Sequence, residues 1–215
     1  LREDLSKARP GFAFLMEEEE QEPAVSPEIG EVKGRVCFEH LRFGYDPEKI
    51  VIQDFSLCVQ PGQTCAIVGE TGSGKTTLVK LLMRFYEPQG GRSTLDGKGL
   101  RDYSRREARK PFGMVLQDTW LFSGSIMENI RYGRPGATDE EVVAAARHAR
   151  ADRFIRALPG GYDMVISEEA DNLSAGQMQL ITIARAVLAD RPLLILDEAT
   201  SNVDTLTEKR IQDAM

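Results

Sequence analysis

The residues best suited to chemistry lie in one eight-residue stretch, GETGSGKT, from Gly69 to Thr76. It matches the pattern G-x-x-x-x-G-K-S/T at every fixed position, and it lies between an apolar run and a predicted helix. Its glycines let backbone N–H groups and the helix N-terminus face an anion, while Lys75 offers a charge and Thr76 a magnesium ligand. The stretch predicts a nucleotide phosphate site. A glycine-rich turn with an accidental Lys-Thr pair is the weaker alternative.

A second set of reactive residues follows the apolar run LLIL, in the sequence LLILDE. Asp197, at the carboxyl end of a predicted strand, could hold Mg²⁺ through water, and Glu198 is a candidate base for an attacking water. Alone, such a run is most often a strand that enters a loop. The phosphate loop upstream makes the catalytic interpretation the better one.

The stretch LSAGQ, residues 173–177, precedes a long apolar helix pattern. A serine hydroxyl, a glycine N–H and a helix N-terminus are groups that bind a γ-phosphate. Taken alone, an ordinary helix N-cap at Ser174 is the better interpretation.

In the order GETGSGKT, VLQD, LSAGQ and LILDEATSNVD, the chain resembles the nucleotide-binding domain of ATP-binding-cassette (ABC) transporters over about residues 31–215. The resemblance implies an α/β P-loop NTPase fold with a parallel core sheet, an N-terminal antiparallel β subdomain and a helical subdomain inserted at about 118–177. In that family two domains dimerise head to tail, with each ATP between the phosphate loop of one and the signature loop of the other. The loop LSAGQ would then contact the ATP of a partner chain.

The resemblance also implies roles for individual residues. The ATP-binding residues would be Tyr45, Gly69, Glu70, Thr71, Gly72, Ser73, Gly74, Lys75, Thr76 and Thr77. The magnesium ligands would be Thr76, Gln117 and Asp197, and the catalytic residues Glu198 and Gln117. The signature loop would be Ser174, Ala175, Gly176 and Gln177, and the D-loop Ser201, Asn202, Val203 and Asp204. Tyr45 would stack on adenine, although a lone aromatic after a strand is equally often a core or rim residue. Without the resemblance, Gln117 is best interpreted as a surface residue at the end of a strand, and residues 201–204 are best interpreted as a plain turn.

Two further stretches look like the exporter branch of the family: LFSGSIMENI, and LSKARPGFAFLMEEEE at the start, which resembles a tether from a membrane domain. The implied partners are a second nucleotide-binding domain, identical or different, and a transmembrane domain of the same transporter. The chain would then lie at the cytoplasmic face of a membrane.

The sequence departs from the family pattern at three places. Ala175 stands where glycine is commonest, and Met178 stands where a basic residue is usual. In SEEAD, residues 167–171, only Glu168 matches the pattern. Such variation makes a heterodimer plausible.

Net charge, apolar runs and cysteine spacing exclude some classes of partner and location. The chain has 215 residues and a net charge of -7, the wrong sign for a nucleic-acid partner, and no apolar run reaches the roughly 18 residues of a membrane span. The acidic, proline-containing first 30 residues predict a solvated linker. Three cysteines without metal or redox spacing predict buried free thiols in a reducing compartment. His40, His148 and the basic run at 101–110 are expected to be structural or solvated, a contact from that run to a membrane domain being the lesser alternative.

The elements that would position these residues follow from hydrophobic patterns. Strands are expected at 35–43, 53–60, 63–69, 112–117 and 192–197, the last buried on both faces, and helices at 75–86 and 178–190. Residues 88–99 read as a glycine-rich turn, and residues 118–177 as a helical lobe in which Thr138 and Glu141 form a capping box.

Two rival functions remain open at this stage. A soluble cassette ATPase of chromosome maintenance or translation is disfavoured by the acidic charge and the tether-like start. A non-catalytic regulatory nucleotide module would require Glu198, or a C-terminal part beyond residue 215, to be inactive. Because the family's switch histidine is expected beyond residue 215, the chain as given should hydrolyse ATP weakly or not at all.

Overall fold

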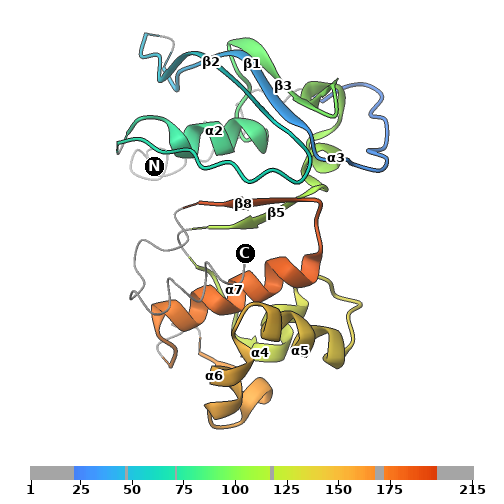
Figure 1. Cartoon of the computed structure of the whole chain (residues 1–215), viewed down its shortest axis with the longest axis vertical. Coiled ribbons are helices and arrows are strands. Elements are labelled where there is room, and N and C mark those ends of the chain that lie inside the picture. Colours follow the sequence, from blue (N-terminus) through green and yellow to red (C-terminus); the bar gives the residue numbers. More distant parts are fainter. Residues whose placement is uncertain (1–21, 47, 71, 117–118, 168–171, 198–215) are drawn as a thin grey trace, which may run out of the picture.

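A computed structural model describes residues 22–46, 48–70, 72–116, 119–167 and 172–197. Their helices and strands are arranged in layers (Figure 1). The strands are β1 (Val36–Phe43), β2 (Ile52–Val59), β3 (Gly90–Leu95), β4 (Lys98–Gly99), β5 (Phe112–Val115), β6 (Gly124–Ser125), β7 (Val165–Ile166) and β8 (Leu193–Leu196). The helices are α2 (Lys75–Leu82), α3 (Arg105–Arg109), α4 (Ile126–Arg131), α5 (Asp139–His148), α6 (Asp152–Ala157) and α7 (Ala175–Ala189), with 3₁₀ turns at Leu100–Asp102 and Gly161–Asp163. This is an α/β arrangement with an antiparallel sheet at one end and a helical lobe at the other (Figure 1).

The N-terminal sheet has the strand order β2-β1-β3-β4 and is antiparallel throughout. β1 does not alternate strictly, since its buried residues include Phe38, Leu41 and Phe43. A shift in register between Phe38 and Leu41 explains this pattern, because an irregularity that adds a residue restores the inward direction for the residues beyond it. His40 lies at this irregularity with a left-handed φ of 50° and an exposed side chain.

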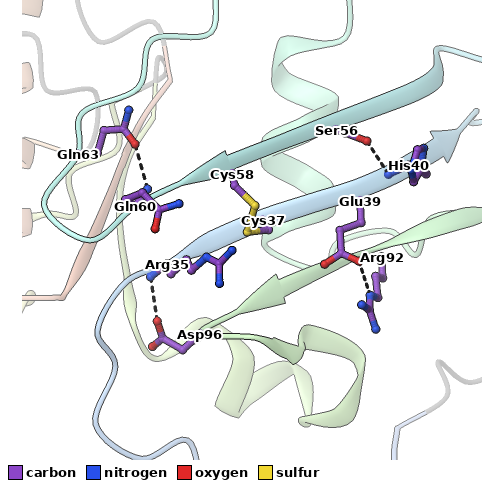
Figure 2. Close-up of a disulfide and its surroundings, with 10 residues drawn as sticks. All are labelled: Arg35, Cys37, Glu39, His40, Ser56, Cys58, Gln60, Gln63, Arg92 and Asp96. Carbon is purple, nitrogen blue, oxygen red and sulfur yellow. Dashed lines mark hydrogen bonds and ion pairs between the residues drawn. A yellow bond between two sulfur atoms is a disulfide. The ribbon is translucent and has the colours of Figure 1, made fainter.

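The cysteines do not follow the expectation of three buried free thiols. Cys37 of β1 lies directly opposite Cys58 of β2, with a Cα–Cα distance of 4.1 Å, and the two form a disulfide (Figure 2). Cys65 is free but exposed. The prediction was wrong because spacing along the chain does not reveal which residues face each other across two strands; the register decides it.

The expected strand at 63–69 does not form. These residues are exposed, Val68 to 88%, and within the described chain they join no sheet. A strand exists only where a neighbour completes its hydrogen-bond ladder, so apolar residues alone were insufficient. Residues 88–99 were expected to form a glycine-rich turn, but they contain strands β3 and β4. β3 forms because it pairs with β1, in a register that runs from Val36↔Leu95 to Arg42↔Gly90.

β5 and β8 form a parallel pair, with the register running from Phe112↔Leu193 to Val115↔Leu196. The expectation of burial on both faces of β8 was wrong: Leu193 and Ile195 are partly buried, whereas Leu194 and Leu196 are exposed. The pair lies between α2 and α7 in Figure 1. Its residues contribute to both hydrophobic clusters, Val115 to the helical one and Leu193 and Ile195 to the one beneath the antiparallel sheet. It therefore joins the two halves of the molecule.

In the helical lobe α4 and α5 pack against α7 and α6 packs against α5, around residues such as Ile130, Val142, Ile155 and Ile181. The predicted capping box of α5 is confirmed, since the Thr138 hydroxyl accepts a hydrogen bond from Glu141 N and the Glu141 carboxylate one from Thr138 N. The short antiparallel pair β6–β7 was not expected.

The described part of the N-terminal segment, residues 22–35, is mostly exposed but makes hydrogen bonds to the domain. It has no regular secondary structure but binds α3: the Glu22 carboxylate and the Ser26 hydroxyl accept hydrogen bonds from Arg105 N and Ser104 N. The basic run is also less solvated than expected, since the Arg109 guanidinium donates to the carbonyls of Met83 and Arg84. Among the described residues, no helix is long and apolar enough to cross a bilayer.

Candidate nucleotide-binding site

The loop that ends at the start of α2 has the backbone of an anion-binding turn. Gly72 and Gly74 have left-handed φ values of 85° and 95°, and Gly74 is the N-cap of α2. Glycine adopts this conformation without strain, so the loop can turn its N–H groups toward one side. The loop also folds back on itself, since Ser73 N donates to the Glu70 carbonyl at 3.1 Å. Thr71 lies outside the described residues.

Lys75 is the first residue of α2, where the helix dipole is positive. Its ammonium donates to the carbonyls of Gly69 at 2.8 Å and Glu70 at 3.0 Å. The lysine therefore lies folded over its own loop, with its charge at the mouth of the turn. A bound anion at this place would compete with two carbonyl oxygens for the same ammonium.

Thr76 and Thr77 follow Lys75 but occupy different environments. Thr76 is exposed, whereas Thr77 is buried and its hydroxyl lies 3.1 Å from the Tyr45 hydroxyl. The sequence placed Thr77 and Tyr45 in one site, and the structure brings them together. Their direct bond fixes the Tyr45 ring at its outer end.

Tyr45 stands just beyond β1 and is half exposed, at 50%. The rings of Phe43 and Tyr86 lie close to it and nearly perpendicular, and the Lys80 ammonium lies 5.7 Å from its centroid. Tyr86 and Lys80 were not among the predicted site residues. Lys80 lies in α2 and Tyr86 beyond its end. No sequence pattern marked either residue, because their contacts with Tyr45 arise only from packing.

Asp197 directly follows β8 and is partly buried. Its N–H donates to the carbonyl of Val115, the last residue of β5, at 3.0 Å. Parallel pairing thus brings Asp197 to the same sheet edge as the segment that leads to Gln117. Gln117, Glu198 and the predicted D-loop residues Ser201, Asn202, Val203 and Asp204 lie outside the described residues.

The predicted signature residues form the first turn of α7. The Ser174 hydroxyl accepts a hydrogen bond from Gln177 N at 3.3 Å, and the Gln177 side chain one from Ser174 N at 2.9 Å, which makes a capping box. The first turn holds no acidic residue, and Ser174 and Ala175 are exposed. Within the described chain, Ser174 makes no hydrogen bond to the phosphate loop. Met178 packs against the helical cluster.

A glycine-rich turn that opens a helix, an acidic residue at the end of a parallel strand and an α/β fold define a P-loop NTPase. Comparison with known proteins gives the family: the family model of the ABC transporter matches residues 52–201. The chain belongs to the ABC transporter family, and it corresponds to the ATP-binding domain of exporter-type members.

Individual relatives support this assignment. The chain is 56% identical over 201 residues to a fatty acid ABC transporter ATP-binding/permease protein of Mycobacterium bovis, covering 94% of this chain and 32% of that protein. It is 45% identical over 205 residues to a β-(1→2)glucan export ATP-binding/permease protein of Brucella suis, covering 94% and 34%. The structure of a bacterial Atm1-family ABC exporter with ATP bound matches with a TM-score of 0.88 and 37% identity, over 100% of this chain and 38% of that chain. The chain thus spans about a third of the length of these relatives.

Proposed function

We propose that this chain binds and hydrolyses MgATP to power export by a linked transmembrane domain, acting as a head-to-tail dimer at the cytoplasmic face of a membrane. One observation carries the proposal: two left-handed glycines turn the loop at the start of α2, where Lys75 places its ammonium. The relatives support the link to a membrane domain, since they are ATP-binding/permease proteins of which this chain matches about a third.

The triphosphate would bind in the turn that ends at Lys75. Its β- and γ-phosphate oxygens would replace the carbonyls of Gly69 and Glu70 as acceptors for the Lys75 ammonium. Backbone N–H groups of residues 69–77 and the N-terminus of α2 would bind the remaining oxygens. The half-exposed ring of Tyr45 would stack on adenine.

Thr76 and Asp197 offer the type of oxygen donor that a magnesium ion requires. Mg²⁺ prefers hard oxygen ligands and is usually held by one or two side chains together with phosphates and waters. The exposed Thr76 follows Lys75, and the partly buried Asp197 lies at the end of β8. Thr76, Asp197 and Gln117 would hold the ion, and Glu198 would activate the attacking water.

A second domain would complete the site through the first turn of α7. Ser174 and Ala175 are exposed and no acidic residue opposes the helix dipole, so an anion from another chain can approach. The Ser174 hydroxyl oxygen accepts the cap bond from Gln177 N, and its O–H can donate to a phosphate oxygen at the same time. The D-loop, Ser201 to Asp204, would contact the opposite site. The second domain can be identical or homologous.

We further propose that residues 1–30 connect to the membrane domain and residues 31–215 form the nucleotide-binding domain, with residues 118–177 as its helical part. The relatives named for fatty acid and for β-glucan match the same portion of the chain. That portion is therefore common to transporters of different substrates. The proposal accordingly concerns ATP and the motor function alone.

Replacing Lys75 with alanine tests the phosphate site. Charge-assisted hydrogen bonds contribute about 1.5–3 kcal/mol each, so Lys75→Ala should weaken MgATP binding at least about tenfold. Calorimetric titration of the full-length protein measures the affinity. Lys98→Ala in β4 is the matched control, because it removes the same charge from an exposed residue outside the site. Equal affinity of the two variants would show that the phosphate loop is wrongly assigned.

A further inference from the structure

Two residues that follow α2, Tyr86 and Gln89, contact the turn that carries Tyr45. We propose that they are positioning residues which hold the Tyr45 ring in the orientation that receives adenine. The inference rests on the proposed function, in which Tyr45 stacks on the base. It assigns a role to a segment that contributes no atom to the phosphate site.

Gln89 binds the backbone of the residue directly before Tyr45. Its side-chain oxygen accepts a hydrogen bond from Gly44 N at 2.7 Å, and its side-chain nitrogen donates to the Gly44 carbonyl at 2.8 Å. Its own N–H donates to the Arg42 carbonyl at 2.9 Å. Both polar groups of Gly44 are therefore fixed by one amide, which sets the direction in which the chain enters Tyr45.

The turn at Gly44 is too tight for any other residue. A Cβ at Gly44 would lie 2.4 Å from the Lys49 carbonyl oxygen and 2.8 Å from that of Asp46. Val51 N donates to the Phe43 carbonyl at 2.8 Å and closes the turn. Because the turn is closed at its base and held by Gln89 at Gly44, the backbone of Tyr45 has little freedom.

Tyr86 restrains the side chain of Tyr45. The centroids of the two rings lie 5.1 Å apart with an interplanar angle of 88°, and Phe43 lies 5.1 Å from Tyr45 and 5.6 Å from Tyr86. Such edge-to-face contacts are favourable. Phe43 is buried at 4% exposure, whereas Tyr86 is 43% exposed, so Tyr86 is the partner of Tyr45 on the solvent side of this aromatic group. The Thr77 hydroxyl holds the outer end of the Tyr45 ring.

The same stretch of chain connects both ends of the proposed nucleotide site. Helix α2 begins with Lys75, and the segment after it brings Tyr86 and Gln89 to Tyr45. At 1.5 Å per residue the eight residues of α2 span about 12 Å. Helix α2 and the short segment after it therefore connect the phosphate-binding and adenine-binding groups, and such preorganisation lowers the entropic cost of binding.

The test compares MgATP with magnesium tripolyphosphate, which lacks adenine, in the full-length protein. Tyr86→Ala and Gln89→Ala should each weaken MgATP binding about two- to tenfold and leave tripolyphosphate binding unchanged. Tyr86→Phe keeps the ring and should bind MgATP like the wild type. Adding Tyr86→Ala to Tyr45→Ala should cause no further loss, because Tyr86 acts through Tyr45.

The variant Tyr45→Ala distinguishes the adenine-binding role of Tyr45 from the positioning role of Tyr86 and Gln89. If it leaves the ratio of the two affinities unchanged, the adenine role of Tyr45 in the proposed function is wrong. If Tyr45→Ala lowers the ratio but Tyr86→Ala and Gln89→Ala do not, the ATP site stands and the positioning role is overturned. Equal losses for MgATP and tripolyphosphate would also overturn it, since they would indicate a general structural role.

Discussion

Asp96 holds the entry to β1 with a single carboxylate. It accepts hydrogen bonds from Lys33 N at 2.8 Å, Gly34 N at 3.2 Å and Arg35 N at 2.9 Å. Figure 2 shows the bond from Arg35. Partial burial acts to raise the pKa of Asp96, but these N–H groups and the charge of Lys33 lower it more, so the pKa lies below the usual 3.8. The folded state therefore stabilises the ionised form of Asp96 more than the unfolded chain does.

A pH-dependent loss of stability follows for Asp96→Asn. Because the folded pKa is depressed, the contribution of Asp96 is present above pH 3.8 and disappears as the pH falls through the folded value. At pH 7 the variant should lose about 1 kcal/mol of unfolding free energy, and the loss should shrink toward zero below pH 4. Denaturant unfolding across this range measures it, with the exposed Asp163→Asn as control. A loss that is independent of pH would contradict the ionic origin.

Helices α5 and α7 begin with equivalent capping boxes, at Thr138 and Ser174. Replacing an N-cap hydroxyl by alanine costs about 1 kcal/mol, so Thr138→Ala and Ser174→Ala should destabilise the fold to a similar extent. Under the proposed function, only Ser174→Ala should also weaken the dimer that forms with MgATP. Denaturant unfolding and light scattering of the full-length protein separate the two effects. If Thr138→Ala impairs the dimer equally, the loss at Ser174 reflects stability rather than phosphate contact.

The elements also show which features of the fold a sequence predicts. The capping box of α5 and the glycines of the phosphate loop were predicted because their signals are local: a hydroxyl three residues before a glutamate, and a spacing that only a tight turn explains. β3 was missed because Gly90 and Gly91 dominate its sequence while its pairing with β1 lies elsewhere in the chain. The strand predicted at residues 63–69 does not form, because its apolar sequence has no pairing partner among the described residues. Tyr86 and Gln89 escaped notice because their contacts to the Tyr45 turn arise only from packing.

At the scale of the whole molecule, the disulfide links β1 to β2 across a sequence separation of 21 residues (Figure 2). A cross-link of this span removes unfolded-state entropy equivalent to about 3 kcal/mol. The unfolding free energy should therefore fall by roughly that amount when a dithiol reductant is added. Cys58→Ser should match the reduced protein and show no response to reductant.

Cys65→Ser supplies the control for this experiment, since Cys65 is exposed and unpaired with another cysteine. That variant should keep the full response to reductant. Of Cys37, Cys58 and Cys65, alkylation of the native, unreduced protein should modify only Cys65 in the wild type and none in Cys65→Ser. Three reactive thiols in the unreduced wild type, together with a stability that ignores reductant, would show that the disulfide is not formed in solution.

The placement of the helical lobe between β5 and β8 has a consequence for folding kinetics. Phe112 pairs with Leu193 about 80 residues later, a contact whose closure is entropically slow. The whole helical cluster lies within that interval, and its contacts among α4, α5 and α7 are closer in sequence. Once the lobe has collapsed, the ends of the interval are already near each other, so the effective loop is much shorter. We therefore expect the lobe to form before β8 pairs with β5 and brings Asp197 to its place, and φ-values of substitutions in α5 and α7 that exceed those in β8 would support this order.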